Sequence, residues 1–253
     1  MTRAAGWAAR AAALVAALCA VTVALSGCGA SPEKLGPTGI DELTIPTPTP
    51  DPADFSGDAT NPWFPLAAGT RWTYRQYTPT STRVVRAEVL PHPRDIAGIA
   101  TTAVRWTFRD QGTTRTAMVR WYAVDSDGNV WWFGQQVEPH GVPLDALARH
   151  SFLAGRDGAE AGLVVSAVPR LGDGYLNAEQ PRVVERRSTV TSLHGTVATT
   201  SRTFRDAVVT RDLSTLEPVH IVQTYFARGI GMVSQQDTSS TSSSLTLVRV
   251  HLP

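Results

Sequence analysis

The fold of this 253-residue chain is decided by the stretch Met118-Val119-Arg120-Trp121-Tyr122-Ala123-Val124-Asp125-Ser126-Asp127-Gly128-Asn129-Val130-Trp131-Trp132-Phe133-Gly134. Asp-Gly between two apolar runs is a strong signal for a β-hairpin, because a type I′ turn needs positive φ at both of its central residues. With that turn, Tyr122 would lie opposite Phe133 on one face, and Ala123 opposite Trp132 on the other. Both faces carry aromatic side chains, which predicts a hairpin that is covered on both sides or lines a cavity.

Short runs with strand periodicity recur along the rest of the chain, separated by Gly, Pro, Ser and Thr clusters. The predicted strands are 71–75, 83–90, 103–109, 113–124, 130–134, 163–165, 182–193, 195–202, 205–212, 219–226, 232–236 and 245–252. Only residues 142–154 have a weak helical pattern. The predicted fold class is all-β, an antiparallel curved sheet or incomplete β-barrel with little helix.

Residues 1–27 have the three parts of a signal peptide. They carry Arg3 and Arg10 but no acid, then 15 apolar residues or Thr from 11 to 25, then Ser26-Gly27. The apolar run is shorter than the roughly 20 residues that a membrane-spanning helix needs. Because a cysteine follows the small pair, Leu25-Ser26-Gly27-Cys28 resembles the lipobox of bacterial lipoproteins. This motif predicts acylation of Cys28 by diacylglycerol, with palmitate among the acyl groups, and a mature chain that starts there.

The predicted domain organisation follows from this anchor. Residues 1–27 are the lipoprotein signal peptide, residues 28–60 are a Pro-rich disordered tether, and residues 61–253 are a single β-rich domain. Alternate prolines within residues 46–52 favour extended polyproline geometry and exclude a helix or a central strand. We therefore expect a protein held on the extracytoplasmic face of the cell membrane by its acylated Cys28, with its domain set away from the lipid.

The charge balance and cysteine content limit the kinds of binding partner and cross-link that can be expected. The chain has 23 basic and 22 acidic residues, and loss of the signal peptide leaves 21 against 22, a net charge of −1. This balance gives no general attraction to nucleic acid. Cys19 is removed with the signal and Cys28 is lipidated, so the mature domain is expected to lack a disulfide. No cofactor or metal is predicted.

Several sequence blocks occur in a fixed order along the domain. They are Asn61-Pro62-Trp63-Phe64-Pro65-Leu66, Gly69-Thr70 with Trp72, Trp121-Tyr122-Ala123, Asp127-Gly128-Asn129-Val130-Trp131, Phe133-Gly134, Ala154-Gly155, Asp157-Gly158-Ala159, Gly172-Asp173 with Tyr175, Thr203-Phe204, Leu216-Glu217-Pro218, Tyr225-Phe226-Ala227 and Gly229-Ile230-Gly231. Over about residues 61–236 they resemble an uncharacterised family of exported and lipid-anchored bacterial proteins, mostly actinobacterial. The chain departs from the family at Ala161 and Arg228, where relatives are expected to have proline. The resemblance implies a shared fold and an envelope location, and no activity.

The aromatic residues are the candidate ligand-binding residues. Those at strand spacing project in pairs to one side of a strand. They could line an apolar cavity, or they could form the core, as large aromatics commonly do in β domains. The candidates are Trp72, Tyr74, Trp106, Trp121, Tyr122, Trp131, Trp132 and Phe133.

Other polar groups give weaker signals. Asp125, Asp127 and Asn129 have the spacing that starts a calcium loop, but glycine and glutamate are missing at its sixth and twelfth positions, so a turn with Asx hydrogen bonds is favoured. Arg182, Arg186 and Arg187 beside Glu185 indicate either an anion site or a solvated edge strand. The six histidines have no metal-ligand spacing, and no catalytic motif is present.

Three function hypotheses remain open from the sequence. The first is non-enzymatic binding of an apolar or amphipathic envelope molecule, a lipid or glycolipid, in an aromatic-lined cavity. The second is a module that docks on an envelope protein or on cell wall. The third is an envelope hydrolase, for which Asp157, Asp173 and His220 are the first residues to mutate.

The lipobox gives a direct test. We expect Cys28→Ser to abolish incorporation of labelled palmitate and to move the protein from the membrane fraction to the soluble fraction, because one thiol carries the diacylglycerol. Cys19→Ser is the matched control and should label like the unmodified chain. Retention of label by Cys28→Ser would contradict the lipobox assignment.

Overall fold

The computed structural model describes residues 49–55, 58–138, 150–216, 220–239 and 243–253. The chain divides into two units, Met1–Gly39 and Ile40–Pro253, and all described residues belong to the second. The signal peptide, Cys28, most of the tether and residues 142–149 of the predicted helical tract lie outside the described residues.

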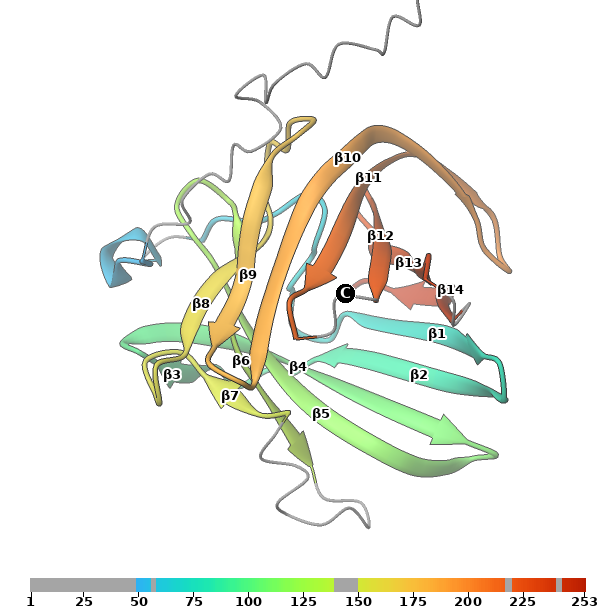
Figure 1. Cartoon of the computed structure of the whole chain (residues 1–253), viewed down its shortest axis with the longest axis horizontal. Coiled ribbons are helices and arrows are strands. Elements are labelled where there is room, and N and C mark those ends of the chain that lie inside the picture. Colours follow the sequence, from blue (N-terminus) through green and yellow to red (C-terminus); the bar gives the residue numbers. More distant parts are fainter. Residues whose placement is uncertain (1–48, 56–57, 139–149, 217–219, 240–242) are drawn as a thin grey trace, which may run out of the picture. The chain divides into compact units, whose positions relative to one another are not determined.

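The described part is built almost entirely of antiparallel strands (Figure 1). Its elements are η1 (Pro52–Phe55), β1 (Arg71–Thr78), β2 (Ser81–Val89), β3 (Arg94–Ile96), β4 (Ile99–Asp110), β5 (Thr113–Val124), β6 (Val130–Glu138), β7 (Phe152–Leu153), β8 (Glu160–Val165), β9 (Gly174–Gln180), β10 (Val184–Ala198), β11 (Thr203–Ser214), β12 (Ile221–Ala227), β13 (Gly231–Asp237) and β14 (Ser244–His251).

Twelve of the described strands form a closed ring. Their order is β2-β1-β14-β13-β12-β11-β10-β9-β8-β6-β5-β4, and β4 pairs back to β2 from Val84 opposite Arg109 to Val89 opposite Val104. The short strands β3 and β7 pair only with β4 and β6, outside the ring. The predicted all-β antiparallel class is confirmed, and the β2–β4 pairing makes the sheet a closed barrel.

Three strands were not predicted. β3 and β7 are only three and two residues long. β7 lies within residues 142–154, for which a weak helical pattern was noted, so the helical prediction is wrong for the described residues 152–153. β9 carries the polar residue Asn177 at a buried position, where it lines a pocket inside the barrel. The predicted strands 182–193 and 195–202 are one strand, β10, which runs through register shifts near Ser192 and Gly195.

The β5–β6 hairpin forms, but in a different register from the one predicted. Tyr122 lies opposite Trp132 and Ala123 opposite Trp131, and a bulge then sets Trp121 opposite Gly134. The reason is the turn: Gly128 N–H donates to the Asp125 carbonyl at 2.9 Å, and only Gly128, at φ 81°, has positive φ in the connection. The five-residue connection 125–129 therefore replaces the expected two-residue type I′ turn.

Both faces of this hairpin are buried, as predicted. Tyr122, Val130 and Trp132 belong to the large cluster inside the barrel. Trp131 and Phe133 belong to a second cluster on the outer face, together with side chains of β3 and of the segment around β7. This second cluster explains why the outer face carries aromatic rather than polar side chains.

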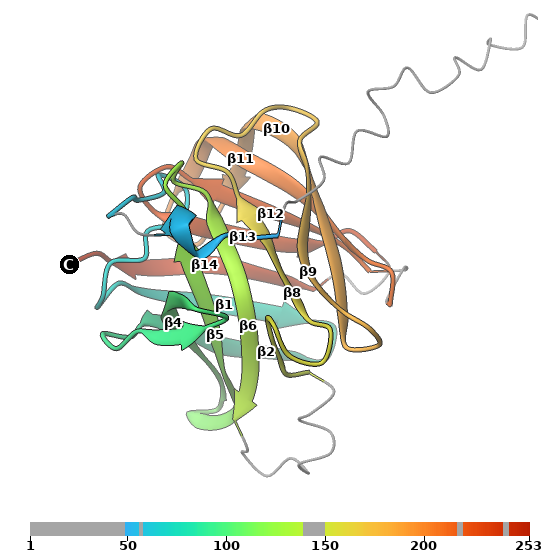
Figure 2. The same ribbon diagram turned by 90° about the vertical axis from the view of Figure 1, so that its left-hand side faces the viewer.

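The helix η1 helps to cover the outer cluster (Figure 2). The Phe55 ring packs edge-on against Trp131 and Phe133, with centroid distances of 6.1 and 5.5 Å. The Asp54 carbonyl accepts a hydrogen bond from Ser126 N–H at 2.7 Å. Residues 52–55 belong to the predicted tether of residues 28–60, and in the structure they form η1, whose Phe55 contacts the barrel.

Residues 61–66 close one end of the barrel. The buried Asn61 side chain donates to the Gly128 carbonyl at 2.7 Å, and its oxygen accepts the Phe64 N–H at 3.0 Å. The Phe64 ring then packs inside the barrel against Trp72, Tyr122 and Phe226.

The side chain of Asp125 holds the hairpin turn together through its carboxylate oxygens. Its carboxylate accepts Asn129 N–H at 2.7 Å, Asn129 Nδ2 at 2.9 Å and the buried Trp131 Nε1 at 2.7 Å. Asp125→Ala strands these donors, so we expect a loss of about 2–4 kcal/mol in the free energy of unfolding by urea denaturation. The exposed Asp127 is the control, and Asp127→Ala should cost less than about 1 kcal/mol. Equal losses in the two variants would contradict this account of the turn.

Candidate functional site

The structure separates the predicted ligand-binding aromatics into two sets. All eight side chains are buried, with 7% exposure or less. Trp72, Tyr74, Trp106, Tyr122 and Trp132 lie in the cluster inside the barrel, whereas Trp121, Trp131 and Phe133 lie in the outer cluster. Of the inner set, Trp106, Tyr122 and Trp132 line interior pockets. The outer set packs against side chains of β3 and β7 and against Phe55.

One wall of the barrel interior is aromatic. Trp106 on β4, Tyr122 on β5 and Trp132 on β6 come from neighbouring strands and point inward, because alternate residues of a strand face the same side. Arg120 lies two residues before Tyr122 on this same face. Its guanidinium carbon is 5.4 Å from the Trp106 ring centroid and 5.3 Å from that of Trp132, so the cation contacts two indole rings.

The facing wall is polar and comes from β9 to β13. Asp212 is its centre: Ser188 Oγ and Thr210 Oγ1 lie 2.6 and 2.8 Å from its Oδ1, and Thr224 Oγ1 lies 2.6 Å from its Oδ2. Gln235 Nε2 in turn donates to Thr224 Oγ1 at 3.1 Å. Buried polar groups in a barrel interior need such partners, and the hydroxyls supply them from three different strands.

Ser188 extends this network to β9. Its Oγ also lies 2.8 Å from Asn177 Oδ1, and Asn177 Nδ2 donates to the Leu163 carbonyl at 2.7 Å. The polar wall is therefore held by contacts that cross from β8 to β13, which positions Asp212 rigidly. We call the space between the aromatic and polar walls the chamber.

Three adjoining pockets make up the chamber, and each is lined by both Arg120 and Arg186. The first has a volume of about 320 Å³ and extends toward Gln76, His220 and Asp237. The second, of about 70 Å³, lies deeper, against Phe64 of the aromatic plug. The third, of about 340 Å³, extends toward Arg182 and His150. The two arginines thus stand where the pockets meet.

The charges of Arg120 and Arg186 both affect the pKa of the Tyr122 phenol. Burial raises the pKa of the Tyr122 phenol above its ordinary value, while the charge and hydrogen bond of Arg120 and the charge of Arg186 offset part of that rise. Burial raises the pKa of Tyr74 well above its ordinary value, with a further contribution from Tyr122. Both phenols are therefore neutral hydrogen-bonding groups in the interior.

Two buried polar atoms of the chamber lining have no hydrogen-bond partner among the described residues. They are Trp106 Nε1, a donor, and Gln76 Oε1, an acceptor. A buried donor or acceptor without a partner costs free energy. Polar groups of a bound molecule would provide the missing hydrogen bonds.

The arginine cluster predicted at 182–187 is divided by the strand. Arg187 is exposed and pairs with Glu185 at 3.5 Å, which fits the solvated-strand interpretation. Arg186, the residue before it, lines the chamber, and Arg182 lines the third pocket. β10 is not an edge strand, because β9 and β11 flank it. The sequence pattern therefore contained both a solvated arginine and an interior one.

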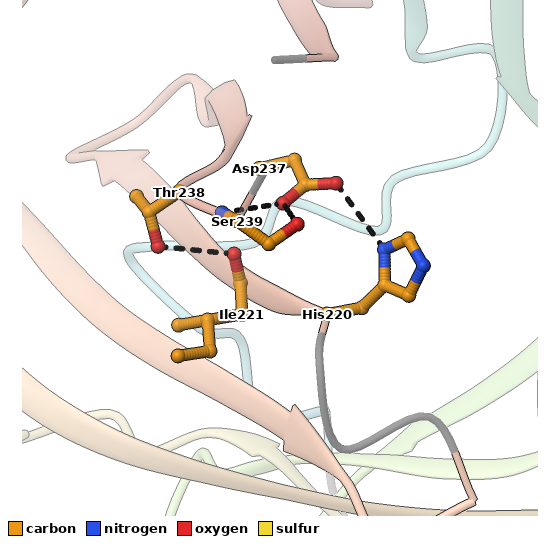
Figure 3. Close-up of polar contacts among 5 residues, drawn as sticks. All are labelled: His220, Ile221, Asp237, Thr238 and Ser239. Atoms are coloured by element: carbon orange, nitrogen blue, oxygen red, sulfur yellow. Dashed lines mark hydrogen bonds and ion pairs between the residues drawn. The ribbon is translucent and has the colours of Figure 1, made fainter. Parts of the chain in front are cut away.

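Of the three residues proposed for a hydrolase, only His220 lines the chamber. Its Nδ1 lies 3.3 Å from Asp237 Oδ2 (Figure 3). Ser239 bonds the same carboxylate through its hydroxyl and through its N–H, the latter at 2.8 Å. The carboxylate thus lies between the histidine and the serine, whereas a nucleophilic triad needs the histidine between them.

Asp157 and Asp173 are not among the residues that line the chamber. Asp157 lies in the turn before β8 with φ 51°, and Asp173 accepts Arg170 N–H at 2.8 Å before β9. In the part of the chain that the structure describes, no group of three His, Cys, Asp or Glu residues could hold a metal ion. The Asp125 hydrogen bonds given above support the Asx turn rather than a calcium loop.

Some chamber residues were missed from the sequence. Arg120 could have been found, because it alternates with Tyr122 on the inward face of the predicted strand. Ser188, Thr210, Asp212 and Thr224 gave no signal, since their convergence depends on the lateral order of β10 to β12.

The described residues contain no helix of the length and hydropathy that a membrane crossing requires.

Comparison with known proteins gives a weak likeness. No protein-family model matches the chain, and no curated protein matches it. A crystal structure of a protein inferred to be exported, with a YmcC-like fold, from Bacteroides fragilis has 15% identity and a TM-score of 0.44 over 75% of this chain and 99% of its own. A protein inferred to be a lipoprotein, from Parabacteroides distasonis, has 10% identity and a TM-score of 0.42 over 77% of this chain and all of its own. Likeness at this level transfers neither function nor location.

Proposed function

We propose that this chain is a lipoprotein anchored through Cys28 on the extracytoplasmic face of the cell membrane, and that its barrel binds an amphipathic envelope molecule without catalysing a reaction. The anchor is supported by the lipobox and the apolar segment before it. The binding role is supported by the chamber. A lipid or glycolipid has the combination of apolar and polar parts that such a site takes.

The observation that carries the proposal is the division of the chamber into an aromatic and a polar wall. Trp106 and Trp132 offer flat apolar surface, and Asp212 with its hydroxyl partners offers polar surface opposite them. Small-molecule sites are concave, largely apolar and supplied with a few placed polar groups. The first and third pockets, at about 320 and 340 Å³, reach the lower end of the usual range for ligand sites.

The competing hypotheses have less support in the described residues. Docking through aromatic side chains requires them on the surface, but all eight candidates are buried. A serine hydrolase triad needs the histidine between the carboxylate and the serine, and the His220, Asp237 and Ser239 contacts do not have that order. The chamber therefore supports the binding function more than either alternative.

Native mass spectrometry tests the proposal directly. The chain carrying Cys28→Ser would be exported by a related bacterial host and purified without detergent. We expect a stoichiometric extra mass that is lost on denaturation, because the chamber would retain its ligand through purification. The mass identifies the ligand class. A clean ligand-free mass, with no uptake of added envelope lipid extract, would contradict the proposal.

A pair of neighbouring substitutions locates the site. Val222 lines the first pocket, whereas Gln223, the next residue of β12, is on the other face of the strand. Val222→Trp should fill the pocket and remove the extra mass, and Gln223→Trp should retain it. Equal retention in both variants would place the ligand elsewhere.

A further inference from the structure

The outer side of four adjacent strands carries an excess of arginine. β4, β2, β1 and β14 are neighbours in the ring, and they contain seven arginines but only two carboxylates, Glu88 and Asp110. Asp110 ends β4 and lies 4.0 Å from Arg115. Five of the seven arginines are exposed and alternate with inward residues, so they project from the outside of the barrel. We call these five the basic face: Arg71, Arg75, Arg86, Arg105 and Arg249.

The pairing of the strands holds the basic face together. Arg86 lies opposite Thr73 of β1, and Thr73 lies opposite Arg249 of β14. Residues paired across antiparallel strands project to the same side, and neighbouring strands are about 4.8 Å apart, so the backbones of Arg86 and Arg249 are about 10 Å apart. Arg71 and Arg75 are the next outward residues of β1 on either side of Thr73. The side chains of Arg71, Arg86 and Arg249 help to line a depression of about 520 Å³ in this surface.

Most of this positive charge is not neutralised within the described part of the chain. Arg71 pairs with Glu88 at 3.2 Å, and Arg105 pairs with Glu138 at 2.7 Å. The guanidinium groups of the other three arginines make no hydrogen bond, ion pair or ring contact with any described residue. These three arginines are therefore able to contact an external anion without breaking an interaction in the protein.

The basic face differs in charge from the rest of the chain. Its five arginines, with Glu88 and Glu138 beside them, have a net charge of +3, whereas the other 16 basic and 20 acidic residues expected in the mature chain give −4. Charged side chains commonly protect the edge of a sheet against association. These four strands have a neighbour on both sides in the closed ring, so they need no such protection.

The chemistry of this surface suits a layer of anionic lipid headgroups. The planar guanidinium group matches phosphate, and the hydrocarbon stem of arginine can cover apolar surface while its charge stays in water. Two apolar side chains lie on the same outer side of β1 and β2, Tyr77 at 38% exposure and Val84 at 40%. β1 and β2 lie side by side next to β4 (Figure 1). Tyrosine is common where proteins meet the boundary between lipid and water.

We infer that the basic face docks the barrel on anionic lipid headgroups of the membrane to which Cys28 is proposed to be anchored. The inference rests on the proposed lipid anchor and adds a second contact with the membrane, and it does not depend on the chamber. Cys28 lies 21 residues before the first described residue, so the chain between them spans at most about 75 Å. The tether thus sets the greatest distance of the barrel from the lipid, and it raises the effective concentration of the basic face there, so weak contacts suffice.

Cosedimentation with vesicles tests the inference. The Cys28→Ser chain, which lacks the proposed lipid, would be mixed with vesicles of phosphatidylcholine alone or of phosphatidylcholine and phosphatidylglycerol in equal parts. We expect binding to the anionic vesicles to be about tenfold tighter or more, because each arginine near such a surface is attracted to it. This preference should be lost at about 0.5 M salt, since salt screens exposed charges.

A triple substitution locates the contact. Arg75→Gln, Arg86→Gln and Arg249→Gln together remove the three arginines without partners. This variant should bind the anionic vesicles about tenfold more weakly or less, and its binding to phosphatidylcholine vesicles should not change. Because the three side chains are exposed, the Tm of the variant should match that of the unmodified chain, which shows that it is folded.

A second triple variant with the same change of net charge is the control. It combines Arg156→Gln, Arg205→Gln and Arg211→Gln, at exposed residues outside the four strands. We expect its binding to the anionic vesicles to weaken by less than about threefold, because these charges lie elsewhere on the barrel. Equal weakening in the two triple variants would show attraction through overall charge and would overturn the inference.

Other outcomes would also overturn the inference and leave the proposed function standing. One is equal binding of the unmodified barrel to both kinds of vesicle. Another is binding to soluble poly(glycerol phosphate) that is as tight, per phosphate, as binding to the anionic vesicles, which would replace the membrane by a cell-wall polymer. The proposed function is tested separately, through palmitate labelling at Cys28 and the mass of the retained ligand.

Discussion

The pairing of β2 with β4 is the constraint on which the rest of the structure depends. It joins the two ends of the sheet, leaves no open edge in the ring, and thereby defines an inside and an outside for every strand. A barrel of about eight strands is just filled by its side chains, and larger barrels enclose space. A ring of twelve described strands therefore needs large inward side chains or a hollow, and this protein has both.

The two ends of the barrel use that space differently. At one end Phe64 enters the barrel on a segment held by Asn61, and its ring packs against the inner aromatics. Toward the other end, Arg120, Arg186 and Asp212 replace apolar side chains, and the packing gives way to the chamber. Buried polar groups stabilise a fold less reliably than apolar packing does, because each must recover the hydrogen bonds it loses with water. Under the proposed function, these interior polar groups contact the ligand.

The sequence predicted the fold class and most strands, because alternation and turn residues are local signals. It also predicted that the β5–β6 hairpin would be buried on both faces. The register of that hairpin was predicted wrongly, since hydrogen bonds of the Asp125 side chain lengthen the connection beyond the two residues assumed. Closure of the ring was not predictable, because it requires β2 to pair with β4 while β3, which lies between them in the sequence, stays outside the ring. The aromatic wall could be anticipated from Tyr122 and its neighbours, but the polar wall required the order of strands around the ring.

Fluorine NMR of the chain labelled with 5-fluorotryptophan, with signals assigned by single Trp→Phe substitutions, tests the central claim most directly. Trp106 and Trp132 line the chamber, whereas Trp121 on β5 and Trp131 on β6 lie in the outer cluster. Saturation with decyl phosphate should shift the Trp106 and Trp132 signals and leave those of Trp121 and Trp131 unchanged. Shifts confined to Trp121 and Trp131 would contradict a binding site inside the barrel.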